Sequence, residues 1–151
     1  MVFMFRPLPT RLKYSRAEYI SDAVVHVLGV FVVAAAVPVL IVLAALGASE
    51  PDAIVGASIY GAAFAVMILC SALYNMIPHP DWEWLLKRLD HSAIYLKIAG
   101  TFTGLVLVVG HHLWLIVALW TTAGAGVALK LIAPHGFRRL GLALYLGMGW
   151  V

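Results

Sequence analysis

Polar side chains that could carry chemistry recur at helical spacing in this apolar sequence. They form three sets, one after the amino-terminal tail and two near the middle of the chain: Glu18, Asp22 and His26; Ser71 and Asn75; Asp90 and Lys97. Residues four or seven positions apart share one face of an α-helix, so each set is expected to line one face. Carboxylate, imidazole and hydroxyl groups are those of acid–base and metal chemistry.

The histidines support a metal site only in part. A zinc site takes three or four nitrogen, sulfur or carboxylate ligands, often including two histidines four residues apart on a helix. None of the six histidines has another histidine four residues away. His26 and Asp90 are candidate ligands, but two ligands are too few for tight binding. Four other histidines are expected in loops, facing solvent or lipid headgroups: His79, His111, His112 and His135.

Composition indicates the kind of structure that must position these groups. Hydrophobic residues make up 64% of the chain and charged residues 11%, whereas a soluble domain has about 25% charged residues. We therefore expect the chain in a membrane. The net charge of +3 does not indicate nucleic acid, because basic residues beside apolar segments set membrane orientation and no basic arm interleaved with aromatic residues is present. The single cysteine, Cys70, excludes an intrachain disulfide.

Apolar runs predict an all-α, polytopic transmembrane helical bundle, since a crossing helix needs about 20 mostly apolar residues. Four runs meet this length: residues 18–46, 53–77, 90–109 and 113–132. The segment 81–89 suits an amphipathic piece at the interface. A fifth run starts near Leu140, and its roughly 12 residues would rise only about 18 Å against a core of about 30 Å. We expect four complete spans and the start of a fifth, from either a longer native chain or a truncated product.

Lysine and arginine positions predict the orientation. The tail of residues 1–17 carries four of them, and the loops after the second and fourth spans carry more, at 87–88 and 138–139. The loops after the first and third spans carry none. By the positive-inside rule, the amino terminus and the second and fourth loops face the cytoplasm. We therefore expect a cytoplasmic tail at 1–17 and one transmembrane domain at 18–151.

With this topology the polar sets reach one depth, just below the cytoplasmic surface. Ionisable groups inside a membrane are costly and usually functional, so their convergence predicts a polar cavity. Simpler explanations stay open at this point. Glu18 and Asp22 suit a helix start, and Asp90 suits an N-cap or an ion partner for a nearby cation such as Lys97. Ser71 can bond a carbonyl of its own helix.

Four segments of the chain carry a family resemblance. They are EYISDAVVHVLG at 18–29, SALY at 71–74, RLDHSAIYLKIAGTFT at 88–103 and YLGMGW at 145–150. Together they resemble the bacterial hemolysin III family, which belongs to the superfamily containing progestin and adiponectin receptors. The resemblance implies seven spans with a cytoplasmic amino terminus, of which this sequence holds the first part.

The resemblance also implies a zinc ion near the cytoplasmic side. In that family, zinc is bound by a histidine four residues after the serine of the second span and by a histidine pair on the last span. The serine and an aspartate at the start of the third span lie beside the zinc-bound water, and these positions are Ser71 and Asp90. The histidine position is Asn75. Because a neutral amide suits zinc much less than imidazole, and the histidine pair is missing from this sequence, we expect weak zinc binding or none.

On this resemblance we expect a protein of the bacterial plasma (inner) membrane, related to zinc-dependent hydrolases of lipid amides or esters. Asp90 would orient or deprotonate water, Ser71 would donate to the oxyanion, and a surrounding shell would support them. That shell is Glu18, Asp22 and His26. Membrane lipids are the expected partners, and self-association stays open. Two functions compete: a metal-free membrane homeostasis or receptor-like protein, and a pore-forming cytolysin, against which the lack of a continuous polar stripe argues.

Overall fold

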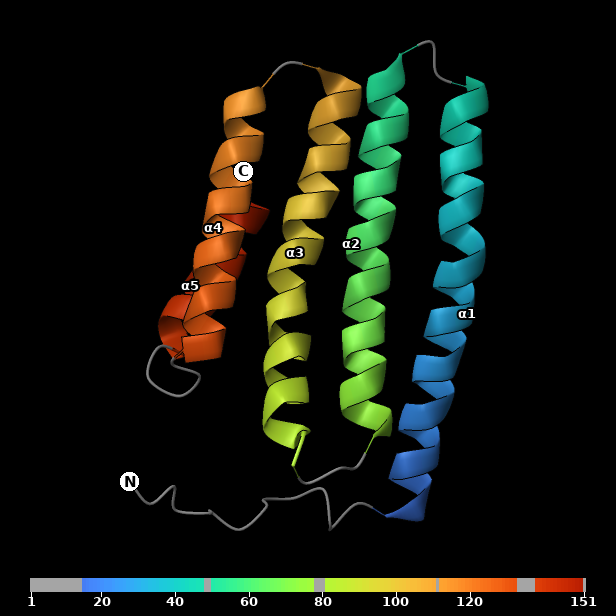
Figure 1. Cartoon of the computed structure of the whole chain (residues 1–151), viewed down its shortest axis with the longest axis vertical. Coiled ribbons are helices and arrows are strands. Elements are labelled where there is room, and N and C mark those ends of the chain that lie inside the picture. The colour runs from blue at the N-terminus through green and yellow to red at the C-terminus, as the bar shows by residue number, and fades with distance from the viewer. Residues whose placement is uncertain (1–14, 48–49, 78–80, 111, 133–137, 151) are drawn as a thin grey trace.

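The computed structural model describes residues 15–47, 50–77, 81–110, 112–132 and 138–150 and contains only helices there. The helices are α1 (Arg16–Gly47), α2 (Pro51–Met76), α3 (Glu83–Val109), α4 (Leu113–Ile132) and α5 (Arg138–Gly149). The first four are long and apolar enough to cross a membrane, whereas α5 has 12 residues. They stand side by side in chain order, with α5 against α3 and α4 (Figure 1). The expected all-α membrane bundle is confirmed.

The bounds of one helix differ from the prediction in a way that matters for the site. The third helix begins at Glu83, so the segment 81–89 is not a separate interfacial piece, and Asp90 lies two turns inside α3 and is not an N-cap. No glycine or proline interrupts this stretch, and helix formation continues through its charges. The 27 residues of α3 reach about 40 Å, which exceeds a hydrocarbon core of about 30 Å, so the charged first turns can extend beyond the core.

Small residues let α2 and α3 pack closely. A Cβ added to Gly56 would lie 3.2 Å from the Cα of Gly104, and one added to Gly100 would lie 2.5 Å from the Cβ of Ala63. Such contacts are typical of helix association in lipid, where van der Waals packing replaces the hydrophobic effect. This close packing fixes how α2 and α3 are rotated about their own axes relative to each other.

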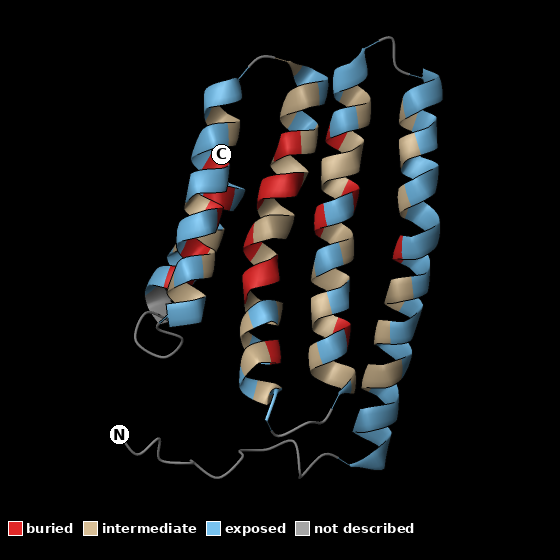
Figure 2. Ribbon diagram, in the orientation of Figure 1, coloured by how far each residue is buried: buried red, intermediate tan, exposed pale blue. Residues whose placement is uncertain are grey.

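The buried core lies between α3, α4 and α5. Its buried members are Tyr95, Ala99, Leu119, Ala123 and Met148. In Figure 2 the buried positions concentrate along α3, while most of α1 is exposed. Polar links tie the neighbours to α3: the Trp120 indole N–H donates to Thr103 Oγ1 at 3.0 Å, and Arg88 donates to the carbonyl of Leu131 at 2.7 Å. The exposed apolar residues of the outer helices suit contact with lipid.

Candidate functional site

A polar cluster joins α1 to α2 near the end of the bundle where α1 begins. His26 comes from α1, and Ser71 and Asn75 come from α2, one turn apart. His26 Nε2 lies 3.2 Å from Ser71 Oγ and 3.0 Å from Asn75 Nδ2. All three side chains are half-buried. A hydroxyl, an imidazole and an amide therefore meet within hydrogen-bonding distance, partly shielded from solvent.

The tautomer of His26 follows from its second nitrogen. Nδ1 lies 2.6 Å from the backbone carbonyl of Asp22, one turn earlier on α1. A carbonyl oxygen only accepts, so Nδ1 carries the hydrogen and the neutral imidazole presents a lone pair on Nε2. That lone pair faces the hydroxyl of Ser71. His26 is thus held in the form that a general base requires.

The amide orientation of Asn75 also follows from its partners. Nδ2 donates to the carbonyl of Ser71 at 2.9 Å and lies 3.4 Å from the Ser71 hydroxyl oxygen. Since a backbone carbonyl accepts and does not donate, the NH₂ group and not the oxygen faces His26. One N–H is used by the Ser71 carbonyl, and the other points toward His26 Nε2.

These residues do not fit a zinc site. The nitrogen that Asn75 turns toward the cluster has no lone pair for a metal, and an amide is a poor zinc ligand in any orientation. Among the residues that the structure describes, no group of three or more histidine, cysteine, aspartate or glutamate side chains could hold a metal ion. The expectation of weak zinc binding or none stays a prediction.

Two residues of the predicted supporting shell are placed differently from His26. Glu18 is exposed and forms a capping box with Ser15: the Ser15 backbone N–H donates to Glu18 Oε2 at 2.7 Å, and the Glu18 N–H donates to Ser15 Oγ at 3.3 Å. This reciprocal pair satisfies free N–H groups at the start of α1, so the helix-start explanation accounts for Glu18. Asp22 contributes through its backbone carbonyl and is half-buried.

Two of the predicted residues, Asp90 and Lys97, come from α3, and only Asp90 lies at the level of the cluster. Asp90 is half-buried and interacts electrostatically with Cys70, the residue before Ser71. Asp90 therefore lies near the same end of α2 as the cluster. Lys97 is directed elsewhere, since its Nζ lies 3.6 Å from the ring centre of Tyr60. The hydrogen bonds of the cluster thus come from α1 and α2, and the convergence of Asp90 on the same site stays a prediction.

Sequence reasoning missed the direct contact between Ser71 and His26. It predicts Ser71 beside the reacting group and His26 only in the surrounding, supporting set. The two residues are separated by 45 positions in the chain, and helical spacing predicts which residues share a face but not which faces meet. The available signal was the repeated four-residue spacing of polar residues on both helices.

Comparisons with known proteins identify relatives across nearly the whole chain. A family model described as haemolysin-III related matches residues 16–151. The curated protein hemolysin-3 of Bacillus cereus is 34% identical over 145 residues, which cover 94% of this chain and 66% of the relative. The hemolysin-3 homolog of Bacillus subtilis is 36% identical over 139 residues, covering 89% of this chain and 64% of the relative. The chain therefore spans about two thirds of the length of these relatives, and no solved structure matches it.

Proposed function

The chain belongs to the hemolysin III family of multi-pass membrane proteins, and we propose that it hydrolyses ester or amide bonds of membrane lipids with Ser71 as nucleophile and His26 as general base. The observation that supports this is the pair of distances at the imidazole: Nε2 to Ser71 Oγ at 3.2 Å and Nδ1 to the Asp22 carbonyl at 2.6 Å. The second contact sets the tautomer that the first one needs. A positioned acceptor for the imidazole N–H is the third member of such nucleophile–base arrangements.

The reaction would run in two stages. Ser71 Oγ bonds to the carbonyl carbon of the lipid while its proton passes to His26 Nε2. The imidazolium then returns that proton to the leaving alcohol or amine as the bond to the acyl group breaks, which leaves an acyl-serine. Water then attacks the acyl carbon with His26 as base, the bond from Ser71 Oγ to that carbon breaks and the carboxylic acid leaves, and the proton on Nε2 restores the Ser71 hydroxyl.

Asn75 supplies a donor that changes partner during this reaction. In the resting site one of its N–H groups faces the lone pair of His26 Nε2 at 3.0 Å. Once Nε2 takes the serine proton it no longer accepts, so this N–H is released for the oxygen of the tetrahedral intermediate. An interaction gained only in the transition state lowers the barrier without tightening substrate binding.

The depth of the cluster suits lipid linkages near the headgroups. Ser71 lies five residues before the end of α2 at Met76, which is about 8 Å along the helix axis. At this distance from the helix end the hydroxyl would lie close to the boundary between hydrocarbon and headgroups, where the ester and amide bonds of lipids lie. By the distribution of basic residues, we assign this end to the cytoplasmic face of the bacterial plasma membrane.

A non-enzymatic function is the second candidate, and a specific contact favours it. Asn75 and Ser71 compete for the one lone pair of His26 Nε2, and a fully bonded polar network can simply fix the packing of α1 on α2. In that case the protein would keep the cluster for structure while acting in membrane homeostasis or as a receptor. The two candidates differ in whether Ser71 reacts.

A fluorophosphonate probe tests the reactivity of Ser71 directly. The purified protein in detergent or nanodiscs is incubated with the probe, and the labelled residue is located by peptide mass spectrometry. We expect labelling at Ser71 that is lost in Ser71→Ala, reduced at least about 100-fold in His26→Gln by loss of the general base, and unchanged by EDTA.

Ser58→Ala is the matched control, because Ser58 is also a half-buried serine of α2 and donates to the Ile54 carbonyl of its own helix at 2.7 Å. This variant should label like the wild type. An unlabelled Ser71, or equal labelling of wild type and His26→Gln, would refute the hydrolase proposal and favour the structural network.

A further inference from the structure

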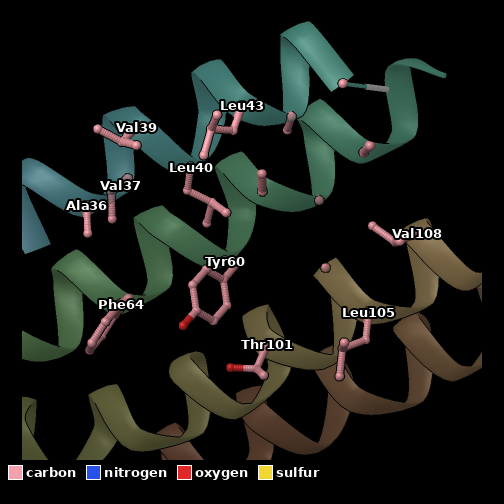
Figure 3. Close-up of a pocket in the computed structure, with 16 residues that line it drawn as sticks. Ala36, Val37, Val39, Leu40, Leu43, Tyr60, Phe64, Thr101, Leu105 and Val108 are labelled. Carbon is pink, nitrogen blue, oxygen red and sulfur yellow. The ribbon is translucent and has the colours of Figure 1, made fainter. Parts of the chain in front are cut away.

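An apolar groove opens between α1, α2 and α3 in the half of the bundle away from the Ser71 cluster. It has a volume of about 810 Å³ and is lined almost entirely by hydrocarbon. Ala36 and Leu40 contribute from α1, Tyr60 and Phe64 from α2, and Thr101 from α3 (Figure 3). Along α2 its lining runs from Ala53 to Phe64, which is about 16 Å of helix.

A lysine contacts residues that line the inner end of this groove. The Nζ of Lys97 is 3.6 Å from the ring centre of Tyr60 and 4.4 Å from that of Phe64, and it donates to Thr101 Oγ1 at 3.2 Å. All three partners line the groove. The aromatic faces attract the ammonium, but they carry no net negative charge. Of these three contacts, only Thr101 supplies an oxygen, and that oxygen belongs to a neutral hydroxyl.

The depth of Lys97 makes its charge costly. It lies 14 residues after the start of α3 and 12 before its end, so about 20 Å of helix separate it from either end. A cation near the middle of the hydrocarbon core is expensive unless it is paired or hydrated, and in membrane proteins such a residue usually marks a binding or transport site. The groove supplies space beside it for a ligand.

We propose that the groove holds the hydrocarbon chain of a fatty acid, whose carboxylate pairs with the ammonium of Lys97. The charge and the shape agree: the walls suit a single apolar chain, and the cation of Lys97, which contacts lining residues at the inner end, suits one acidic group. Each ion is costly in hydrocarbon when alone, and the pair reduces the cost of both.

A fatty acid fits this placement better than a phospholipid. The phosphate of a two-chain lipid stays in the headgroup layer, and a lysine side chain cannot bridge the roughly 15 Å from the middle of a hydrocarbon core of about 30 Å to that layer. Neutral alcohols of the same chain length can fill the groove but have no charge for Lys97. The inference does not depend on hydrolysis at Ser71.

Photocrosslinking tests the site and its chemistry. A diazirine-bearing palmitic acid is added to the protein in nanodiscs, and crosslinked peptides are mapped. We expect crosslinks on the groove-facing parts of α1, α2 and α3, and competition by palmitate but not by hexadecanol or phosphatidylglycerol at equal concentration. Lys97→Met should lower crosslinking about tenfold, as expected for loss of one charged hydrogen bond, while Lys97→Arg should retain most of it.

Two further variants test the position of the charge and the space in the groove independently. Lys87→Met removes an exposed cation of the same helix and should crosslink like the wild type. Ala36→Phe narrows the groove and should lower crosslinking with Lys97 intact. Equal crosslinking of wild type and Lys97→Met, or competition by hexadecanol as strong as that by palmitate, would overturn the proposal. So would crosslinks spread over the exposed face of α4.

Discussion

Replacing Gly126 by alanine should destabilise the bundle strongly because its α carbon lies against the ring of Tyr95. A Cβ built at this position would overlap the ring, which is fully buried. The ring cannot move without disturbing the hydrogen bond from the Tyr95 hydroxyl to the carbonyl of Gly141 at 3.1 Å, which links α3 to α5. Overpacking costs about 1–3 kcal/mol, and loss of one buried hydrogen bond adds about 1 kcal/mol. We expect a loss of about 2–4 kcal/mol.

The chain offers a matched control two residues away. Gly124 lies on the same helix, and a Cβ added there would meet nothing within 4 Å. Gly124→Ala should therefore leave stability within about 1 kcal/mol of the wild type, since only backbone entropy and helix propensity change.

Thermal unfolding in detergent, followed by loss of the monodisperse peak in size-exclusion chromatography, measures both variants. At about 2–4 °C per kcal/mol for a chain of this size, Gly126→Ala should melt roughly 5–15 °C below the wild type. The reasoning fails if the two alanine variants melt together. It also fails if Gly126→Ala melts low while Tyr95→Phe, which removes the hydroxyl without overlap, melts lower still.

Three further outcomes are expected. Asp90→Asn should slow fluorophosphonate labelling of Ser71 about threefold, because a carboxylate at this end of α2 stabilises the positive charge that develops on the imidazole as the serine proton is transferred; an unchanged rate would limit Asp90 to a structural role. Cysteines placed singly at Glu50 and Lys87, in a cysteine-free background, should be labelled from opposite sides of the membrane of intact cells; labelling of both from one side would contradict the assigned orientation. Dye-loaded liposomes should stay intact when the protein is added, because the described helices carry no continuous polar stripe through the bilayer; dye release would support the cytolysin function that the names of the relatives suggest.

The fold was largely predictable because membrane spans depend on local composition. The run from Leu113 to Ile132 was predicted with the bounds that α4 has, since a loop on one side and a proline soon after the other mark its ends. The predicted start of α3 was wrong because the charged residues within 81–89 resemble an interfacial segment, although glutamate, lysine and arginine are good helix formers and no glycine or proline interrupts the helix from Glu83. Composition identifies the apolar part of a helix better than its polar extension beyond the core.

For the site, only the depth of the residues in the membrane was predictable from the sequence. Periodicity placed His26, Ser71 and Asn75 at one depth, and the structure brings them into contact. It could not predict that the α1–α2 contact turns His26 onto Ser71, because the rotation of two packed helices depends on residues elsewhere, such as Val37 against Gly61. The same limit applied to Lys97, which shares a helical face with Asp90 by spacing.

Lys97 shows why a shared face does not imply a shared site. Its side chain lies two turns from Asp90, where α3 faces the aromatic rings of Tyr60 and Phe64 and not the polar end of α2. The close contact of Gly100 with Ala63 holds these surfaces together, so a small residue on α3 determines the surroundings of a cation one turn away. These two polar residues of α3 therefore have different surroundings: Asp90 lies near the Ser71 end of α2, and Lys97 contacts residues that line the apolar groove. Variants at Asp90 and Lys97 should accordingly be independent, with Lys97→Met leaving the labelling of Ser71 unchanged and Asp90→Asn leaving fatty-acid crosslinking unchanged.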